Sequence, residues 1–320
     1  MSLKDNDWDD LLESIKEKKC TPFIGERACA PWLPFGRDLA SKWADEHGYP
    51  LEDSYQLSRV AQFLAIEEGD NNHPKHILRK HLEKVEPPNF SLEEHRKTPY
   101  SVLADLNLPV YITTNHDLFM EAALKSKGKA PVSDFCLWNK DLRSLAKTAE
   151  IFSVFERGSK YRPTPSSPLV YHLYGLYCLS VQYRPNDRDI QDDKDIPQSM
   201  VLTEKDYIDF VINLNKEDEK IIFPPVIRQA LAMTSLLFIG YSLDDISFRV
   251  IFQGVVSLQA SMRKTSIAVQ FPPRIAYNKP DQARKYLDQY TKDMFKVHVY
   301  WGDASEFSKE LRQRWDNFKK

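Results

Sequence analysis

Polar side chains cluster directly after a short apolar run near the middle of the sequence. Residues 110–112 are β-branched or aromatic, and a run this short is typical of a buried strand. Thr114, Asn115, His116 and Asp117 follow it, at the end of the strand where open α/β sheets bind ligands. The alternative is an ordinary strand-to-helix turn, in which Asp117 is the N-cap of the next helix.

Glycine turns end other short apolar runs. Glycine is scarce, with 10 in 320 residues, against an average of about 7%, so each one is informative. Phe23 and Ile24 lead into Gly25, and a helix is expected to begin at Gly36. Strand, glycine turn and helix form the geometry that holds a pyrophosphate on backbone N–H groups. One glycine does not distinguish this geometry from a plain strand-to-helix connection.

Two later runs have the same form. The run 169–174 contains His172 and ends at Gly175, and the run 235–239 ends at Gly240. A lone histidine in an apolar run is usually a core residue, so His172 is a candidate only because a glycine turn follows it. The repeated pattern predicts several strands whose carboxyl ends carry turns suited to a ligand.

The order of strands and helices predicts the fold class. Apolar strands alternate with helices, and most connections are long enough for right-handed crossovers. We therefore expect a doubly wound, mostly parallel, Rossmann-like α/β sheet. The chain is predicted to be a single domain over residues 1–320, with a helical insertion over about 50–106.

Four other segments carry more local predictions. No regular element is expected over 129–167, and the basic segment 72–85 is interpreted as a solvated helix face. Thr203 is expected to be a helix N-cap, with Asp206 completing an approximate capping box. The last helix should bury one stripe of apolar residues at helical spacing, namely Phe307, Leu311 and Trp315.

Composition narrows the class of protein. The chain is 42% hydrophobic and 28% charged, with a net charge of −2. No basic field argues for direct nucleic-acid binding, and no apolar run approaches the roughly 20 residues of a membrane helix. The amino terminus is acidic and polar rather than a secretory signal, so a cytoplasmic location is expected. The four cysteines show no C-x-x-C spacing, and no metal site is expected.

Four stretches together resemble the sirtuin superfamily, and more closely its bacterial branch of NAD-hydrolysing defence domains. The segment VLTEKDY, which lies between the last two stretches, is also typical of that branch. The resemblance covers most of the chain and rests on the order and spacing of the motifs. The four stretches are PFIGERACAPWLPFGRDLA (22–40), YITTNHD (111–117), VYHLYG (170–175) and FIGYSLDD (238–245).

The resemblance implies roles for individual residues. Asn115 matches the asparagine that holds the nicotinamide ribose or the attacking water, and Asp117 matches the acid that receives the nicotinamide carboxamide. His172 matches the general base, a role that histidine fills without a tuned pKa. The implied nucleotide-binding residues are Gly25, Arg27, Ala28, Thr114, Asp117, Gly240 and Ser242.

The sequence departs from the family pattern at two places. Glu26 and Arg27 replace the usual alanine and glycine after Gly25. Side chains there should obstruct the approach of a pyrophosphate, and Glu26 brings a negative charge, although Arg27 could pair with a phosphate. His116 stands where the family commonly has tyrosine.

The resemblance implies that NAD is the substrate of a glycohydrolase that releases nicotinamide and ADP-ribose, as an anti-phage defence effector. The alternative is a catalytically degenerate sirtuin-like subunit that binds a nucleotide or serves assembly. Protein deacylation is disfavoured because the cysteine pairs of the deacylase zinc module are missing. By analogy, we expect a homo-oligomer and a separate sensor protein, such as a nucleic-acid ATPase or an Argonaute-like protein.

Overall fold

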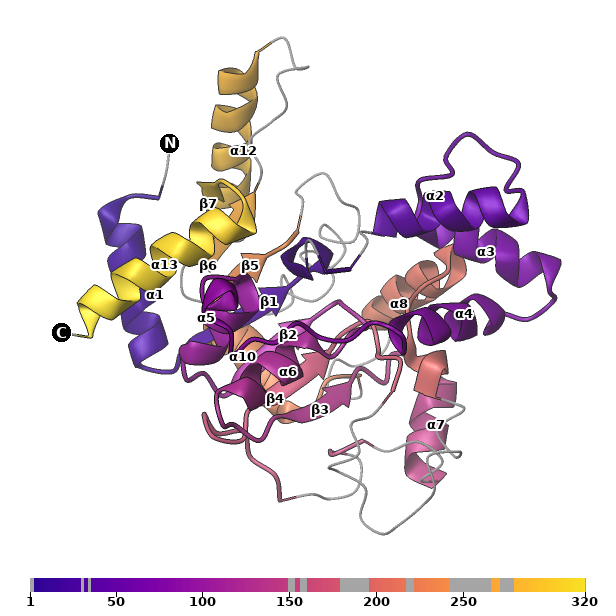
Figure 1. Ribbon diagram of the computed structural model, residues 1–320, viewed down its shortest axis with the longest axis horizontal. Helices are drawn as coiled ribbons and strands as arrows, with labels where there is room; N and C mark the ends of the chain where they lie inside the picture. The colour runs from indigo at the N-terminus through magenta and orange to yellow at the C-terminus, as the bar shows by residue number, and fades with distance from the viewer. Residues whose placement is uncertain are drawn as a thin grey trace.

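Seven parallel strands form one sheet at the centre of the computed structural model (Figure 1). The strands are β1 (Cys20–Ile24), β2 (Val110–Thr113), β3 (Val132–Phe135), β4 (Leu169–His172), β5 (Ser235–Ile239), β6 (Ser266–Gln270) and β7 (Val297–Trp301). Their order across the sheet is β3-β4-β2-β1-β5-β6-β7, and every recorded pairing is parallel. The predicted doubly wound α/β fold is confirmed.

The structure describes residues 3–29, 32–33, 36–148, 153–155, 160–178, 196–216, 222–241, 266–270 and 279–319. Its α-helices are α1 (Asp5–Lys16), α2 (Gly36–His47), α3 (Leu57–Glu67), α4 (His73–Leu82), α5 (Pro99–Asp105), α6 (Phe119–Ser126), α7 (Lys140–Thr148), α8 (Glu204–Lys216), α10 (Pro225–Met233), α12 (Pro280–Phe295) and α13 (Ala304–Phe318). Short 3-10 turns are η1 (Glu26–Cys29), η2 (Glu93–His95) and η5 (Ile196–Ser199). In the described part of the chain, none of the helices combines the length and apolar character that crossing a membrane requires.

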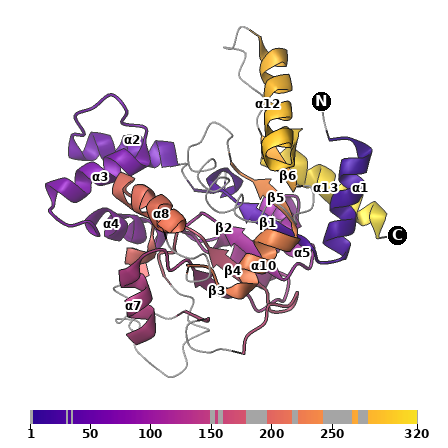
Figure 2. The same cartoon turned by 180° about the vertical axis from the view of Figure 1, so that it is seen from behind.

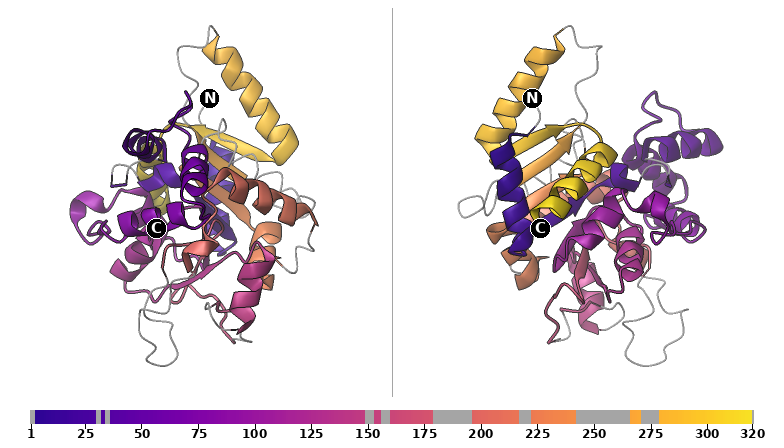
Figure 3. Two further views of the ribbon diagram at one scale, coloured as in Figure 1. Left: turned by 90° about the vertical axis from the view of Figure 1, so that its right-hand side faces the viewer. Right: turned by 60° about the vertical axis from the view of Figure 1, so that its left-hand side comes forward.

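Alternation along the strands directs neighbouring side chains into two separate cores. Phe23 and Ile112 belong to the core under α7, α8 and α10, and α10 lies in front of the strands in Figure 2. Ile24 and Tyr111 belong to the core under α1, α5, α6 and α13 (Figure 3). The two groups of helices bury the central strands on both faces. Strands that are buried on both faces are continuous apolar runs rather than alternating ones.

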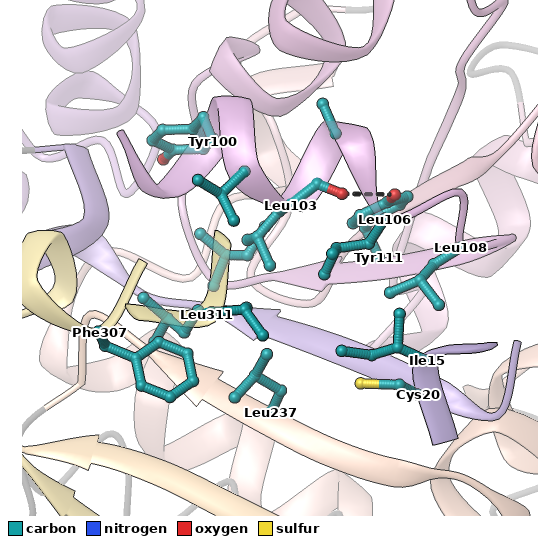
Figure 4. Close-up of a cluster of buried hydrophobic side chains, with 14 of the residues drawn as sticks. Ile15, Cys20, Tyr100, Leu103, Leu106, Leu108, Tyr111, Leu237, Phe307 and Leu311 are labelled. Atoms are coloured by element: carbon teal, nitrogen blue, oxygen red, sulfur yellow. Dashed lines mark hydrogen bonds between the residues drawn. The ribbon is translucent and has the colours of Figure 1, made fainter. Parts of the chain in front are cut away.

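The second core is closed by hydrogen bonds as well as by apolar packing. Tyr111 is fully buried, and its hydroxyl donates to the carbonyl oxygen of Leu103 at 3.0 Å (Figure 4). This bond satisfies a phenol that burial would otherwise penalise. Phe307, Leu311 and Trp315 of α13 are buried at helical spacing, which confirms the prediction for the last helix.

Helices α2, α3 and α4 form a group to one side of the sheet (Figure 1). Their contacts with one another bury Leu39, Trp43, Val60 and Leu64, and Met200 joins the same cluster. Helix α5 also falls within the predicted insertion, but it packs on the sheet beside α6 and α13. The division of the chain into domains stays a prediction.

The expectation of no regular element over 129–167 is wrong, because β3 and α7 lie there. Strand β3 has two consecutive polar residues between its apolar first and last residues, and both polar residues are buried. Ser133 donates to Glu121 at 2.7 Å, and Asp134 accepts from Ser153 at 3.1 Å. Polar residues that find partners inside the protein conceal the apolar pattern by which a buried strand is recognised.

The interpretation of 72–85 as a solvated face is also wrong for part of α4. Leu78 and Leu82 are buried, and Lys75 is only 3% exposed. The Lys75 ammonium donates to Asp206 of α8 at 3.0 Å. The Asp206 carboxylate accepts the backbone N–H of Thr203, and the Thr203 hydroxyl accepts the backbone N–H of Asp206. The predicted capping box at the start of α8 is therefore confirmed.

Candidate functional site

The centre of the sheet is the point where the strand order changes direction. From β1 the chain goes to β2 on one side, and β5 pairs with the other edge of β1. Gly25, Thr114 and Gly240 directly follow these three strands. In doubly wound sheets this switch point opens a crevice for ligands at the carboxyl ends of the strands.

Two of these turns contact each other through their backbones. The N–H of Arg27 donates to the carbonyl of Gly240 at 3.1 Å, and the N–H of Ala28 donates to that of Gly25 at 3.1 Å. A Cβ on Gly25 would lie 2.7 Å from the Gly240 oxygen, and one on Gly240 would lie 2.5 Å from the Ala28 nitrogen. Both glycines are therefore required by their mutual approach. A contact of this turn with a nucleotide stays a prediction, and Ser242 lies outside the described residues.

Gly240→Ala should lower the free energy of unfolding by about 2–4 kcal/mol, from overpacking and from a left-handed backbone together. Gly240 has φ of +85° as well as the short backbone contact. Gly128→Ala is the matched control, since Gly128 has φ of +72° but open space where a Cβ would lie. Urea unfolding of the two variants separates the two contributions. Equal losses would show that the backbone contact is not restrictive.

Asn115 is held rigidly at the end of β2. Its side-chain Nδ2 donates to the Gly25 carbonyl at 3.3 Å and to the Tyr100 hydroxyl at 3.1 Å. Its backbone N–H donates to Thr113 at 3.0 Å. Asn115 is 7% exposed and lines a cavity. The amide plane is therefore fixed before any ligand arrives, as a positioning group requires.

Thr114 joins the β2 turn to the β5 turn. The Tyr241 hydroxyl donates to the Ile24 carbonyl at 3.0 Å, so the Thr114 hydroxyl donates to the Tyr241 oxygen at 2.9 Å. Asp117 accepts the N–H of Phe119 at 2.9 Å, at the start of α6. Leu118, rather than Asp117, is the N-cap of α6, so Asp117 bonds the first helical N–H from the residue before the cap. The same aspartate lines the cavity, where its predicted role toward nicotinamide stays a prediction.

His172 is fully buried at the end of β4. Its Nδ1 lies 3.0 Å from the Asn115 carbonyl, and its Nε2 lies 2.9 Å from Glu121 Oε1. A carbonyl and a carboxylate both accept hydrogen bonds, so this geometry favours the form of the ring in which both nitrogens carry a proton. Burial is the largest single effect and lowers the pKa of His172, but Glu121, the Asn115 carbonyl and Asp117 together raise this pKa above 6.5. His172 as the general base stays a prediction, but the geometry directs neither ring nitrogen into the cavity.

His116 contrasts with His172 in both contacts and charge. It is partly exposed and lines the cavity. Its Nδ1 lies 3.1 Å from the Gly175 carbonyl, so Nδ1 carries the proton of the neutral ring. Burial lowers the pKa of His116 to about 4 despite this hydrogen bond. The ring is therefore neutral at physiological pH.

The cavity has a volume of about 140 Å³ and two chemically different walls. The sheet turns supply polar groups, whereas helices α2, α3 and α4 supply leucines. Tyr174 and Tyr207 were not singled out from the sequence, since each lies in a pattern that also fits core packing. The residues that line the cavity are Glu26, Leu33, Gly36, Leu39, Leu57, Leu78, His81, Leu82, Thr114, Asn115, His116, Asp117, Tyr174, Leu202, Tyr207, Gly240 and Tyr241.

A known protein family matches the part of the chain that holds most of the candidate site. The model of the SIR2-like domain family matches residues 109–294, which hold Asn115, His172 and Gly240. The chain belongs to the SIR2-like family. NAD(+) hydrolase ThsA from Cytobacillus dafuensis is 28% identical over 134 residues, which are 40% of this chain and 25% of that protein. The chain thus spans about a quarter of that curated relative. A solved structure of a Sir2 enzyme aligns over 99% of both chains, with 13% identity and a TM-score of 0.41.

Glu26, the first departure from the family pattern, lies in the wall of the cavity. Its Oε2 accepts the N–H of Gly36 at 3.3 Å, at the first residue of α2. A helix amino terminus favours a negative group, and here the protein's own carboxylate supplies one. Arg27, the expected compensating charge, is not one of the residues that line the cavity.

Among the described residues, no three histidine, cysteine, aspartate or glutamate side chains gather so that they could hold a metal ion.

Proposed function

We propose that this SIR2-like chain is an NAD glycohydrolase that releases nicotinamide and ADP-ribose. The supporting observation is the convergence of Asn115, His116 and Asp117 on one cavity at the switch point of the sheet. The name of the relative, NAD(+) hydrolase, supports the same substrate. NAD would be consumed as a substrate, and the chemistry needs no metal ion.

The residues present suit departure of nicotinamide from a ribose. The reaction passes through an oxocarbenium-like state, which is helped by a fixed ribose and a fixed water. Asn115 would bind a ribose hydroxyl or the water, because its amide is already immobilised by Gly25 and Tyr100. Asp117 would accept a hydrogen bond from the nicotinamide carboxamide. Thr114 and the Gly240 turn would contact the rest of the nucleotide.

Asn115→Ala should lower NAD turnover by at least about 100-fold, because it removes the group that orients the reacting ribose. Free nicotinamide and ADP-ribose would be followed by chromatography. Asn317→Ala is a control, since Asn317 is exposed on α13. Circular dichroism would verify that both variants are folded. Wild-type turnover in the Asn115 variant would contradict this role.

A catalytically degenerate subunit is the second candidate, and the position of Glu26 favours it. Its carboxylate holds the first residue of α2 and gives the cavity wall a negative charge where a phosphate would approach. The Glu26→Ala/Arg27→Gly double variant, assayed beside wild type, separates the two functions. NAD cleavage by wild type supports the glycohydrolase. Cleavage by the double variant alone supports a degenerate subunit whose activity is blocked by Glu26 and Arg27.

The biological setting follows from the family by analogy. We propose a cytoplasmic anti-phage effector that forms a homo-oligomer and responds to a separate sensor protein. Light scattering at increasing protein concentration tests the oligomer, and a chain that stays monomeric throughout would contradict it.

A further inference from the structure

His116 lines the cavity, and only one nitrogen of its ring makes a hydrogen bond in the described part of the chain. His116 Nδ1 is committed to the Gly175 carbonyl at 3.1 Å, so the lone pair of the neutral ring is on Nε2. Within the described part of the chain, no hydrogen-bond partner meets this Nε2. The backbone of His116 is anchored as well, because its carbonyl accepts the N–H of Tyr177 at 3.4 Å.

The two other histidines near the cavity are not suited to take a proton from a ligand. Both nitrogens of His172 donate to buried acceptors, Asn115 and Glu121. His81 lines the apolar wall, but its Nε2 is buried and has no hydrogen-bond partner among the described residues. Both nitrogens of His172 are therefore engaged, and Nε2 of His81 is closed to solvent.

Charged groups of both signs surround His116, and none makes a hydrogen bond to its ring in the described part of the chain. Adjacent positive charge keeps an imidazole neutral, whereas carboxylates favour its charged form. The groups that face it are His172 of β4, Lys75 of α4, Asp206 of α8, and the cavity residues Glu26 and Asp117.

We propose that His116, rather than His172, is the general base of the hydrolysis, an inference that rests on the proposed function. The water oxygen bonds to the anomeric carbon of the nicotinamide ribose as the carbon–nitrogen bond breaks. The electron pair of the broken bond goes to the nicotinamide nitrogen, which leaves neutral. The water proton passes to His116 Nε2 and is then released, so NAD and water give nicotinamide, ADP-ribose and a proton.

His172 then acts as a positioning residue. Its Nδ1–H holds the Asn115 carbonyl at 3.0 Å and so fixes the backbone that carries Asn115 and His116. While both of its nitrogens donate to Asn115 and Glu121, the His172 ring has no lone pair for another proton, which argues against the role of base.

The test is the pH dependence of kcat/KM for NAD, which reports the ionisation of the free enzyme's base. Because the pKa of His116 is lowered to about 4, kcat/KM should change by less than about twofold between about pH 7.5 and 5.5. A base with the ordinary pKa of about 6.5 would lose about tenfold over that range. His116→Gln should lower kcat/KM by at least about 100-fold. The exposed His47 provides the control, His47→Gln, which should match wild type.

The outcomes separate the two proposals. A tenfold loss of kcat/KM toward acid pH, or wild-type rates in His116→Gln, would overturn His116 as the base and leave NAD hydrolysis standing. No NAD turnover by the wild-type chain would overturn the proposed function and this inference together. Nitrogen NMR of the wild-type chain adds a structural readout, which should show the Nδ1–H tautomer of a neutral ring at neutral pH.

Discussion

His172→Gln should lower the free energy of unfolding by about 3–5 kcal/mol, because it removes one member of a buried ion pair. His172 is 0% exposed and Glu121 is 2% exposed. Without the imidazolium, Glu121 would keep only the hydroxyl of Ser133, at 2.7 Å from Oε1. Its other oxygen is buried and has no hydrogen-bond partner among the described residues. A buried carboxylate left without its counter-charge is the main source of the loss.

The same pair predicts the direction of a pH effect. Burial disfavours the charged ring, but Glu121 and the Asn115 carbonyl raise the pKa of His172 above 6.5. The folded state therefore holds this proton more tightly than the unfolded state does. The stabilisation is fully present below about pH 6.5 and is lost as the pH rises through the folded-state pKa.

Urea unfolding of wild type and His172→Gln at about pH 6 and about pH 9 measures both effects. The difference between the two proteins should shrink as the pH rises. The Glu121→Gln/His172→Gln double variant should lose less than the sum of the single losses, since both changes remove one interaction. A loss below about 1 kcal/mol, or a difference that is constant with pH, would contradict a charged pair.

The location of the site could be predicted from the sequence, because parallel strands place their carboxyl ends at one edge of the sheet. The polar residues after 110–112 and the glycine after 235–239 were sufficient to bring Asn115 and Gly240 to that edge. The distance between these residues in the sequence does not affect this result. The edge at which each strand ends depends only on strand direction and on the handedness of crossovers.

The orientation of His172 was harder to predict, although one signal was available. Val170 faces the core under α6, and strand alternation puts His172 on the same face, two residues later. The partner itself could not be found, because Glu121 is 51 residues away and lies in a helix whose pattern allows an exposed acid. Buried polar pairs between distant segments leave no local pattern in the sequence.

Lys75→Met should lower the free energy of unfolding by about 3–5 kcal/mol, because it leaves the Asp206 carboxylate buried without its cation. The side chains of Lys75 and Asp206 are 4% and 11% exposed, and their charged atoms lie 3.0 Å apart. Lys80→Met is the matched control, since Lys80 is exposed on the same helix and its loss should cost less than about 0.5 kcal/mol.

This ion pair also connects two helices that line the cavity. It joins α4, which supplies Leu78 and Leu82 to the apolar wall, to α8, which supplies Tyr207. Helices α4 and α8 both pack on α3, and we expect the ion pair and this packing to hold the wall in place. Lys75→Met should therefore become more sensitive to limited proteolysis within α4 before global unfolding, whereas Lys80→Met should not. Unchanged proteolysis together with a large loss of stability would show that the pair stabilises the whole domain without controlling the wall.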